Sequence, residues 1–185
     1  VSAAAWSAGD ATPADRMATG DKYLDSGKLY VAKLNADGSG QWIELSLANA
    51  AVAAYAAYKF ADQGDIMVNA RLAADAVGAT KMDRPEWCSV NPKNGEIYYS
   101  LTNNSNRSVN PSGSSQVAPD SANPRAYTDM KGTSAQNGNP NGHIVRLKEG
   151  TGASQATAFT WDVYMFGAEA SADAGKVNLS NLTAD

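Results

Sequence analysis

The sequence predicts a mainly β fold built from antiparallel hairpins, with one short helical insertion at about residues 50–78. Segments that alternate apolar and polar residues occur in three pairs along the 185 residues, and each pair is separated by turn-forming or loop-forming residues. Between the first two pairs the sequence changes to alanine-rich, helix-forming residues. Hairpins spaced along a chain in this way are typical of radial β architectures. No repeat of fixed period is present, so a WD-type propeller is not indicated.

The first predicted hairpin joins residues 28–34 (KLYVAKL) to residues 41–47 (QWIELSL). Both segments have the period of two that is expected of half-buried strands. Residues 35–40 (NADGSG) are turn formers, so they predict the loop that reverses the chain.

The helical insertion consists of two predicted helices. Residues 50–61 are strong helix formers, and residues 66–77 place apolar side chains on one stripe. Asp65 is suited to the N-terminal turn of the second helix, and Gly78 is suited to its C-terminal end.

The second hairpin is predicted over residues 85–90 and 96–102, and the third over residues 143–148 and 158–166. Between them, residues 103–142 read as a long loop that is rich in Asn, Ser, Pro and Gly. We expect residues 1–185 to form part of a single domain. The first 20 residues read as irregular, and the last segment, residues 167–185, reads as a polar tail.

Composition excludes several classes of function. The net charge of −4 and the charged fraction of 18% do not provide the basic face of a nucleic-acid binder. One cysteine and one histidine exclude a disulfide within the chain, a Cys-based zinc site and a His-rich metal site. A metal would therefore depend on oxygen ligands, which favours a hard cation such as calcium. No stretch is apolar enough to span a membrane, and the start at Val1 suggests a removed targeting peptide or an internal piece of a longer protein.

The richest stretch for chemistry is residues 80–107. It contains KMDRPEW at 81–87, VNPKNGEIY at 90–98 and LTNN at 101–104. These motifs resemble the PhoX family of secreted bacterial alkaline phosphatases. Further segments agree in the same order: residues 20–34, 38–45, 70–75, 78–80, 139–146 and 159–162.

The resemblance implies an internal segment of a β-propeller phosphatase that holds calcium and iron and is exported to the periplasm or the cell exterior. It implies hydrolysis of phosphomonoesters. Family members are longer than this chain, so the resemblance also implies that additional polypeptide is needed to complete the propeller. We therefore expect the 185 residues to be an incomplete piece of the catalytic unit.

The resemblance carries a metal-binding role to Glu86, the glutamate of the Arg-Pro-Glu-Trp motif. Asn103 and Asn104 follow a predicted strand and could offer oxygen ligands to calcium. Asp83 and Arg84 could orient Glu86 by contacting the ligand and not the metal itself. Each group also has a structural interpretation: Glu86 as an ion-paired strand-end residue, the two asparagines as turn formers, and Asp83 with Arg84 as a surface ion pair. No catalytic residue is assigned.

Other conspicuous residues have structural interpretations. Alternation from Glu86 predicts Cys88 as a small buried residue, and His143 is expected to be a hydrogen-bonded structural histidine. The tryptophans are expected to pack between strands, which applies to Trp42, Trp87 and Trp161.

Three functions remain open at this point. The first is a PhoX-like metal-dependent phosphomonoesterase. The second is a non-catalytic structural or partner-binding protein that retains the propeller scaffold, which is favoured by Ser105 at a position where relatives often have an acidic residue. The third is a calcium-stabilised binding module whose loop at residues 103–142 recognises a partner.

Overall fold

The computed structural model describes residues 16–24, 27–131, 133–150 and 156–167. The chain forms two compact units. The first comprises residues 1–32 and 42–79, and the second comprises residues 33–41 and 80–185. The expectation that residues 1–185 form part of a single domain stays a prediction.

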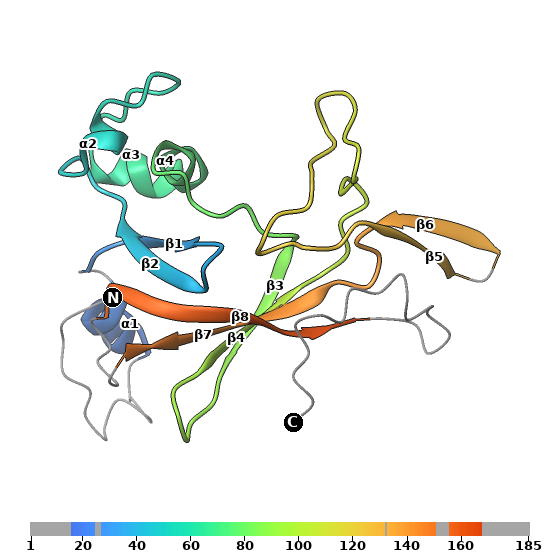
Figure 1. Cartoon of the computed structure of the whole chain (residues 1–185). Helices are drawn as coiled ribbons and strands as arrows, with labels where there is room; N and C mark the ends of the chain where they lie inside the picture. Colours follow the sequence, from blue (N-terminus) through green and yellow to red (C-terminus); the bar gives the residue numbers. More distant parts are fainter. Residues whose placement is uncertain (1–15, 25–26, 132, 151–155, 168–185) are drawn as a thin grey trace. The chain divides into compact units, whose positions relative to one another are not determined.

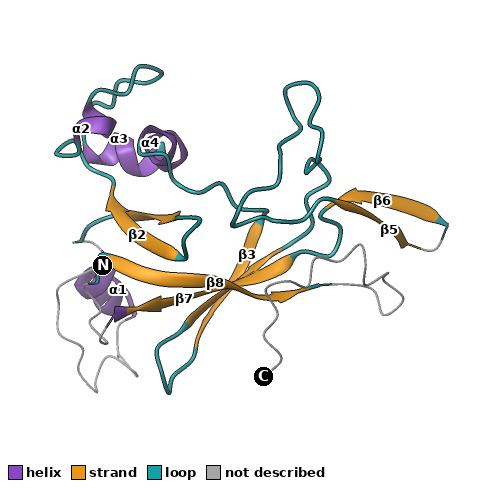
Figure 2. Cartoon of the chain, viewed as in Figure 1, coloured by secondary structure: helices purple, strands orange, loops and turns teal. Residues whose placement is uncertain are grey.

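The first unit contains the helices. They are α1 (Arg16–Leu24), α2 (Ala50–Ala53), α3 (Gln63–Val68) and α4 (Ala70–Ala76), shown in purple in Figure 2. The side chains of Leu45, Val52, Phe60, Ile66 and Ala73 are buried together and form the apolar core of this unit.

Capping explains where these helices begin. Asn49 Oδ1 accepts a hydrogen bond from the backbone N–H of Ala51 at the start of α2, at 3.0 Å. Asp62 does the same for Asp65 at the start of α3, at 2.8 Å. Such caps satisfy amide groups that have no partner within the helix.

The predicted helical insertion is present, but its boundaries were wrong. The first helix ends at Ala53 rather than continuing to residue 61, and the second is divided at Asn69 into α3 and α4. Asp65 lies in the first turn of α3, as predicted, whereas the cap is Asp62. The Asp65 carboxylate accepts hydrogen bonds from Tyr58 Oη at 2.9 Å and Ala61 N at 2.8 Å. These contacts fix a turn where alanine content alone predicts a helix, so tertiary bonding overrides local propensity. The prediction that residues 1–20 are irregular was wrong for residues 16–20, which lie in α1.

The strands are β1 (Tyr30–Leu34), β2 (Ser39–Glu44), β3 (Pro85–Val90), β4 (Ile97–Leu101), β7 (His143–Glu149) and β8 (Ala158–Phe166), in the sheet order β1-β2-β8-β7-β4-β3. The pairs β2–β8, β8–β7, β7–β4 and β4–β3 are antiparallel. The pairing of β2 with β8 is made by Ser39, Gly40 and Gln41, which belong to the second unit. All three predicted hairpins are therefore present, and the mainly β fold class is confirmed.

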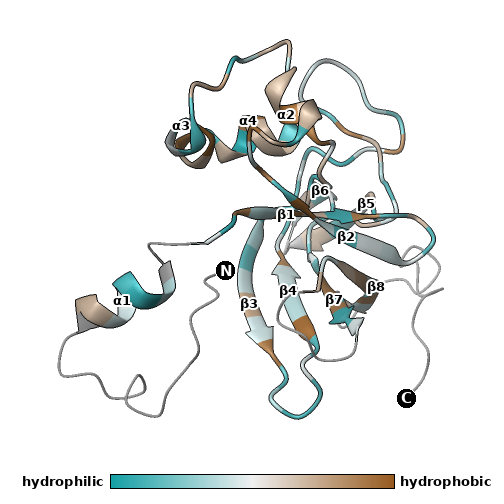
Figure 3. Ribbon diagram, turned by 90° about the vertical axis from the view of Figure 1, so that its left-hand side faces the viewer, coloured by the Kyte–Doolittle hydropathy of each residue, from teal (hydrophilic) through white to brown (hydrophobic). Residues whose placement is uncertain are grey.

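Alternation buries one face of the sheet in the second unit. Val145 and Leu147 on β7 and Phe159, Trp161 and Val163 on β8 are buried, while the residues between them are more exposed. Figure 3 marks the hydrophobic positions along these strands. This is the pattern of an antiparallel sheet with one face toward a core.

The segment predicted as a loop over residues 103–142 contains a further hairpin, so that prediction was wrong in part. Strands β5 (Tyr127–Lys131) and β6 (Ser134–Gly138) form a separate two-stranded sheet. Residues 102–126 remain without regular strands or helices, as the teal trace between β4 and β5 shows (Figure 2). The predicted polar tail lies outside the described residues except for Gly167.

Candidate metal centre

Glu86, the principal candidate ligand, lies at an irregularity in β3. Pro85 pairs with Leu101 and Trp87 pairs with Ser100, so Glu86 is an extra residue between two successive pairs. Such a bulge changes the direction of a side chain and breaks the simple alternation of the strand. The Glu86 side chain is exposed.

The residue before Pro85 has an uncommon backbone conformation. Arg84 has φ = 41°, the only positive φ outside glycine among the described residues. Its carbonyl oxygen accepts hydrogen bonds from Thr102 N at 3.1 Å and Thr102 Oγ1 at 3.4 Å. These bonds hold the start of β3 against the end of β4 and compensate the cost of the strained conformation.

The Arg84 side chain connects two predicted ligands. Its Nη1 donates to Asn103 Oδ1 at 3.0 Å, and its Nη2 lies 3.9 Å from Glu86 Oε1. A guanidinium cation therefore lies beside oxygen atoms from both Glu86 and Asn103. Oxygen donors of this kind suit calcium, and a carboxylate also suits iron, so the donor chemistry fits the implied cofactor.

Asn104 is engaged differently. Its Nδ2 donates to Asp83 Oδ1 at 2.6 Å, and its Oδ1 accepts from Asn106 N at 3.0 Å. Its backbone N–H and carbonyl both bond to Asn139 at 2.9 Å. Each oxygen of Asn104 thus already accepts one hydrogen bond, and its predicted role as a ligand stays a prediction.

Asp83 is completely buried rather than a surface residue, which excludes the surface ion pair with Arg84 considered from the sequence. Its carboxylate accepts hydrogen bonds from Asn104 Nδ2, from Arg107 Nε at 2.7 Å and from Asn139 Nδ2 at 3.2 Å. Its own backbone N–H donates to Asn123 Oδ1 at 2.7 Å. These hydrogen bonds offset the cost of removing the carboxylate of Asp83 from water.

Arg107 completes this buried network. Besides the bond to Asp83, its Nη1 donates to Ala118 O at 2.6 Å and to Asp120 Oδ2 at 3.0 Å. Two members of this network are sequence neighbours of the candidate residues: Asp83 precedes Arg84, and Asn104 follows Asn103. The network therefore fixes the backbone that carries Arg84 and Asn103. Sequence reasoning missed Arg107, Asn123 and Asn139, because burial of a loop residue leaves no periodic signal.

His143 is structural, as predicted. Its Nε2 lies 2.7 Å from Ala122 O, so that nitrogen carries the proton, and Nδ1 accepts from Asn139 Nδ2 at 3.1 Å. Burial lowers the pKa of His143 below its ordinary value of 6.5. The ring is therefore a neutral hydrogen-bonding group within the network.

Two predictions for the second hairpin were wrong. Cys88 is exposed, because β3 is the last strand of the sheet and is exposed along its length. Trp87 is 76% exposed, whereas Trp161 is buried and donates from Nε1 to Asn35 O at 2.9 Å. Alternation predicts burial only where a neighbouring layer covers the strand, and β3 lacks such a layer within the described residues.

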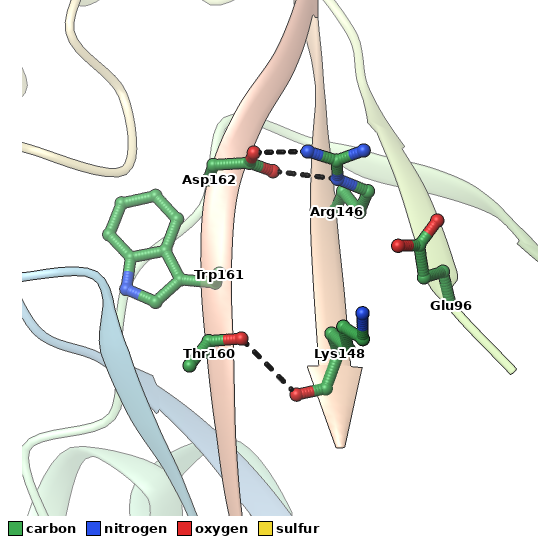
Figure 4. Close-up of a pocket in the computed structure, with 6 residues that line it drawn as sticks. All are labelled: Glu96, Arg146, Lys148, Thr160, Trp161 and Asp162. Carbon is green, nitrogen blue, oxygen red and sulfur yellow. Dashed lines mark hydrogen bonds and ion pairs between the residues drawn. The ribbon is translucent and has the colours of Figure 1, made fainter. Parts of the chain in front are cut away.

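A second polar region lies on the sheet, in a pocket of about 290 Å³. Figure 4 shows its lining residues: Glu96, Arg146, Lys148, Thr160, Trp161 and Asp162. Arg146 binds Asp162 through two parallel hydrogen bonds, from Nε at 3.1 Å and from Nη2 at 2.5 Å. Because Arg146 and Asp162 neutralise each other, this pocket is a weaker candidate for a metal site than the region around Glu86.

No group of three or more His, Cys, Asp or Glu side chains gathers as a metal site within the described residues. None of the described helices is long and apolar enough to cross a membrane. A complete metal site at Glu86 would therefore need ligands beyond the described His, Cys, Asp and Glu residues.

Comparison with known proteins identifies the family. The profile described as Alkaline phosphatase PhoX matches residues 8–184. The chain belongs to the PhoX family. The resemblance found in the sequence is thereby confirmed, and no match was found among curated proteins.

A solved structure of Pseudomonas fluorescens PhoX, in complex with the transition-state analogue vanadate, is similar in fold. The TM-score is 0.58 and the sequence identity is 37% over 78% of this chain. This likeness confirms the predicted relation to the PhoX propeller. The matched region is 23% of the length of the P. fluorescens PhoX chain.

Proposed function

We propose that this chain is part of a PhoX-type, metal-dependent phosphomonoesterase. Membership of the PhoX family over residues 8–184 carries this proposal, and the similar P. fluorescens PhoX was solved with a transition-state analogue. The cofactor consists of calcium and iron. The protein acts after export, in the periplasm or outside the cell, and further polypeptide completes the propeller and the ligand set.

Glu86 is proposed as a metal ligand. Glu86 is the extra residue of the bulge in β3, its side chain is exposed, and its carboxylate forms an ion pair with Arg84 at 3.9 Å. An ion pair of that length between exposed groups is weak. The carboxylate can therefore exchange the guanidinium for a metal at little cost.

Asn103 and Asn104 are proposed as oxygen ligands near the same metal, and Arg84 and Asp83 as positioning residues. Asp83 fixes Asn104 through the bond from Nδ2, and Arg84 fixes Asn103 through the bond to Oδ1. When bound, the metals supply positive charge that stabilises the developing charge on a phosphoryl group. The contribution of these residues is to hold oxygen donors in place.

Hydrolysis of a chromogenic phosphomonoester by the full-length protein tests this proposal. We expect activity that requires calcium and iron, and a loss of at least about 100-fold in kcat/KM for Glu86→Gln, which keeps size but removes the anionic ligand. Glu96→Gln is the matched control, since Glu96 lies at the other end of the same hairpin and hydrogen-bonds Tyr98 at 2.8 Å. A Glu86→Gln protein with full activity and full metal content would refute the assignment.

A non-catalytic scaffold is the second candidate. It is favoured by the engagement of the Asn104 side chain in protein hydrogen bonds, and by Ser105, where the resemblance leads us to expect an acidic residue. A folded full-length protein that contains neither metal and has no turnover would support the scaffold over the phosphatase.

A further inference from the structure

Arg125 is a buried arginine whose hydrogen bonds are incomplete. It precedes β5 and is only 2% exposed. Its Nη1 donates to Gly167 O at 2.7 Å, but its Nε and Nη2 are buried without a hydrogen-bond partner among the described residues. Buried guanidinium nitrogens are almost always bonded, because an unpaired one keeps the cost of losing water.

The two unbonded nitrogens form one edge of the guanidinium. The N–H bonds of Nε and Nη2 point in the same direction, and this edge binds carboxylate or phosphate oxygens through two parallel hydrogen bonds. Arg146 uses these same two nitrogens for Asp162. The contrast between Arg146 and Arg125 indicates that the group missing at Arg125 is an oxyanion.

The surroundings limit where that oxyanion can bind. The guanidinium carbon of Arg125 lies 4.1 Å from the Phe166 ring centroid and 5.2 Å from that of Tyr127. Stacking on aromatic rings stabilises the faces of the cation but satisfies no N–H group. The unbonded edge remains for a partner that lies in the guanidinium plane.

Among the described residues, Arg125 makes no ion pair that would compensate its charge. Burial lowers the pKa of the guanidinium, Tyr127 opposes part of that effect, and the nearby His143 is neutral. A buried charge without a counter-ion costs several kcal/mol. An anion at the Nε–Nη2 edge would remove that cost.

A cavity adjoins the residue to which Arg125 is bonded. Gly167, whose carbonyl accepts from Arg125, lines a cavity of about 530 Å³ together with Asn103, His143, Met165 and other residues, and Arg125 itself is covered. The cavity is open to solvent, so a small solute can reach Gly167 without unfolding of the sheet.

We propose that the Nε–Nη2 edge of Arg125 is a bidentate binding site for a small oxyanion. Phosphate and carboxylate share the required chemistry, with two oxygens spaced to accept the two parallel hydrogen bonds. Asn103, a proposed metal ligand, lines the same cavity as Gly167, but Arg125 is not one of the proposed metal ligands and anion binding there does not require the proposed hydrolysis.

Side-chain NMR of the full-length protein with ¹⁵N-labelled arginine tests this site directly. The Nε–H signal of Arg125 is assigned by its loss in Arg125→Lys, and phosphate or formate is added at constant ionic strength. We expect a saturable shift of this signal. The anion that binds with the lower Kd shows whether the site prefers phosphate or carboxylate. The Arg146 signal should remain fixed, because its edge is bonded to Asp162. A signal that neither anion moves overturns the proposal, whether the edge is empty or bonded to another group of the protein.

Thermal unfolding provides a second readout that does not need the assignment. The preferred anion should raise the Tm of the wild-type protein, since a ligand that binds only the folded state stabilises it. Arg125→Met should abolish this rise, and Arg146→Met should retain it. Equal stabilisation of wild type and Arg125→Met would contradict the proposal. Glu86→Gln should leave the anion effect at Arg125 intact, so failure of the proposed hydrolysis and failure of this site can be distinguished.

Discussion

Arg107 Nε donates to Asp83 Oδ1 at 2.7 Å, and the two side chains are only 4% and 0% exposed. A pair so fully removed from water depends on every partner, because removing one charge leaves the other buried and uncompensated. The pair also joins residue 83, two positions before the start of β3, to the irregular segment that follows β4. Its integrity therefore determines the backbone positions of Arg84 and Asn103.

Asp83→Asn should be strongly destabilising. The amide is close in size but removes the buried carboxylate and leaves Arg107 with the partly exposed Asp120 as its carboxylate partner, so we expect a loss of about 3–5 kcal/mol in the free energy of unfolding. Denaturant titration of the full-length protein measures this loss. Asp162→Asn breaks the largely exposed pair with Arg146 and should cost at most about 1 kcal/mol. Equal losses for Asp83→Asn and Asp162→Asn would contradict the view that the buried pair contributes more to stability than the exposed pair.

Arg84 allows its backbone and side-chain roles to be separated. Arg84→Ala and Arg84→Gly both remove the guanidinium, but only glycine adopts φ = 41° without steric cost. We therefore expect Arg84→Gly to be more stable than Arg84→Ala by about 1 kcal/mol in denaturant titration. At Ser89, within β3, the order should be reversed, because glycine weakens a regular strand. An alanine variant as stable as the glycine variant would argue against strain at residue 84.

Acid should destabilise the protein through His143. Its pKa is lowered in the folded state, so below about pH 6.5 the unfolded state binds more protons and stability falls with pH. Protonation would also set Nδ1–H against the amide of Asn139 and add a charge that faces Arg107, Arg125 and Asp83. The loss contributed by one proton is at most about 1.4 kcal/mol per pH unit.

His143→Gln tests this assignment, because it removes the titrating group and keeps hydrogen-bonding capacity. The difference in the free energy of unfolding between pH 7.5 and pH 5.5 should be smaller for His143→Gln than for wild type. The same difference in both proteins would show that other groups cause the acid sensitivity.

Two glycines with similar backbone conformations should differ sharply in tolerance. Gly95 has φ = 73° and open space around it, whereas a Cβ at Gly142, with φ = 68°, would lie within 2.2 Å of Leu101 O. Gly95→Ala should cost about 1 kcal/mol, the strain of the conformation alone. Gly142→Ala must also displace the backbone at the end of β4, so its cost should be clearly larger in the same denaturant titration. Equal costs would contradict the close packing at residue 142.

The sequence predicts the sheet better than the candidate metal centre. Alternation located β3 and β8 with the boundaries found in the structure, because strand periodicity is a local property. The same alternation failed for Trp87 and Cys88, since burial depends on what covers the strand. The bulge at Glu86 and the positive φ of Arg84 arise from pairing with β4 and from bonds to Thr102, which no local pattern encodes.

The buried network shows the same limit. Asp83 lay in the stretch that the sequence singled out, but its partners Asn123 and Asn139 lie in a segment predicted to be a simple loop. Asparagine is frequent in such loops for local reasons, so its type does not distinguish a turn former from a buried donor. The hairpin of β5 and β6 was missed because its strands contain many residues of low β propensity, such as Asp129, Asn137 and Gly138.

The hydrogen bonds to Asp83 have a consequence for the folding rate. They connect residues separated by 21, 24, 40 and 56 positions in the sequence, so each must close a long loop before it contributes. We expect the hairpins to form first and this network to form after the rate-limiting barrier. Substitution of Asp83 should then accelerate unfolding and leave refolding almost unchanged, a kinetic signature that stopped-flow measurements can test. The network would thus govern how long a folded molecule persists rather than how fast one forms.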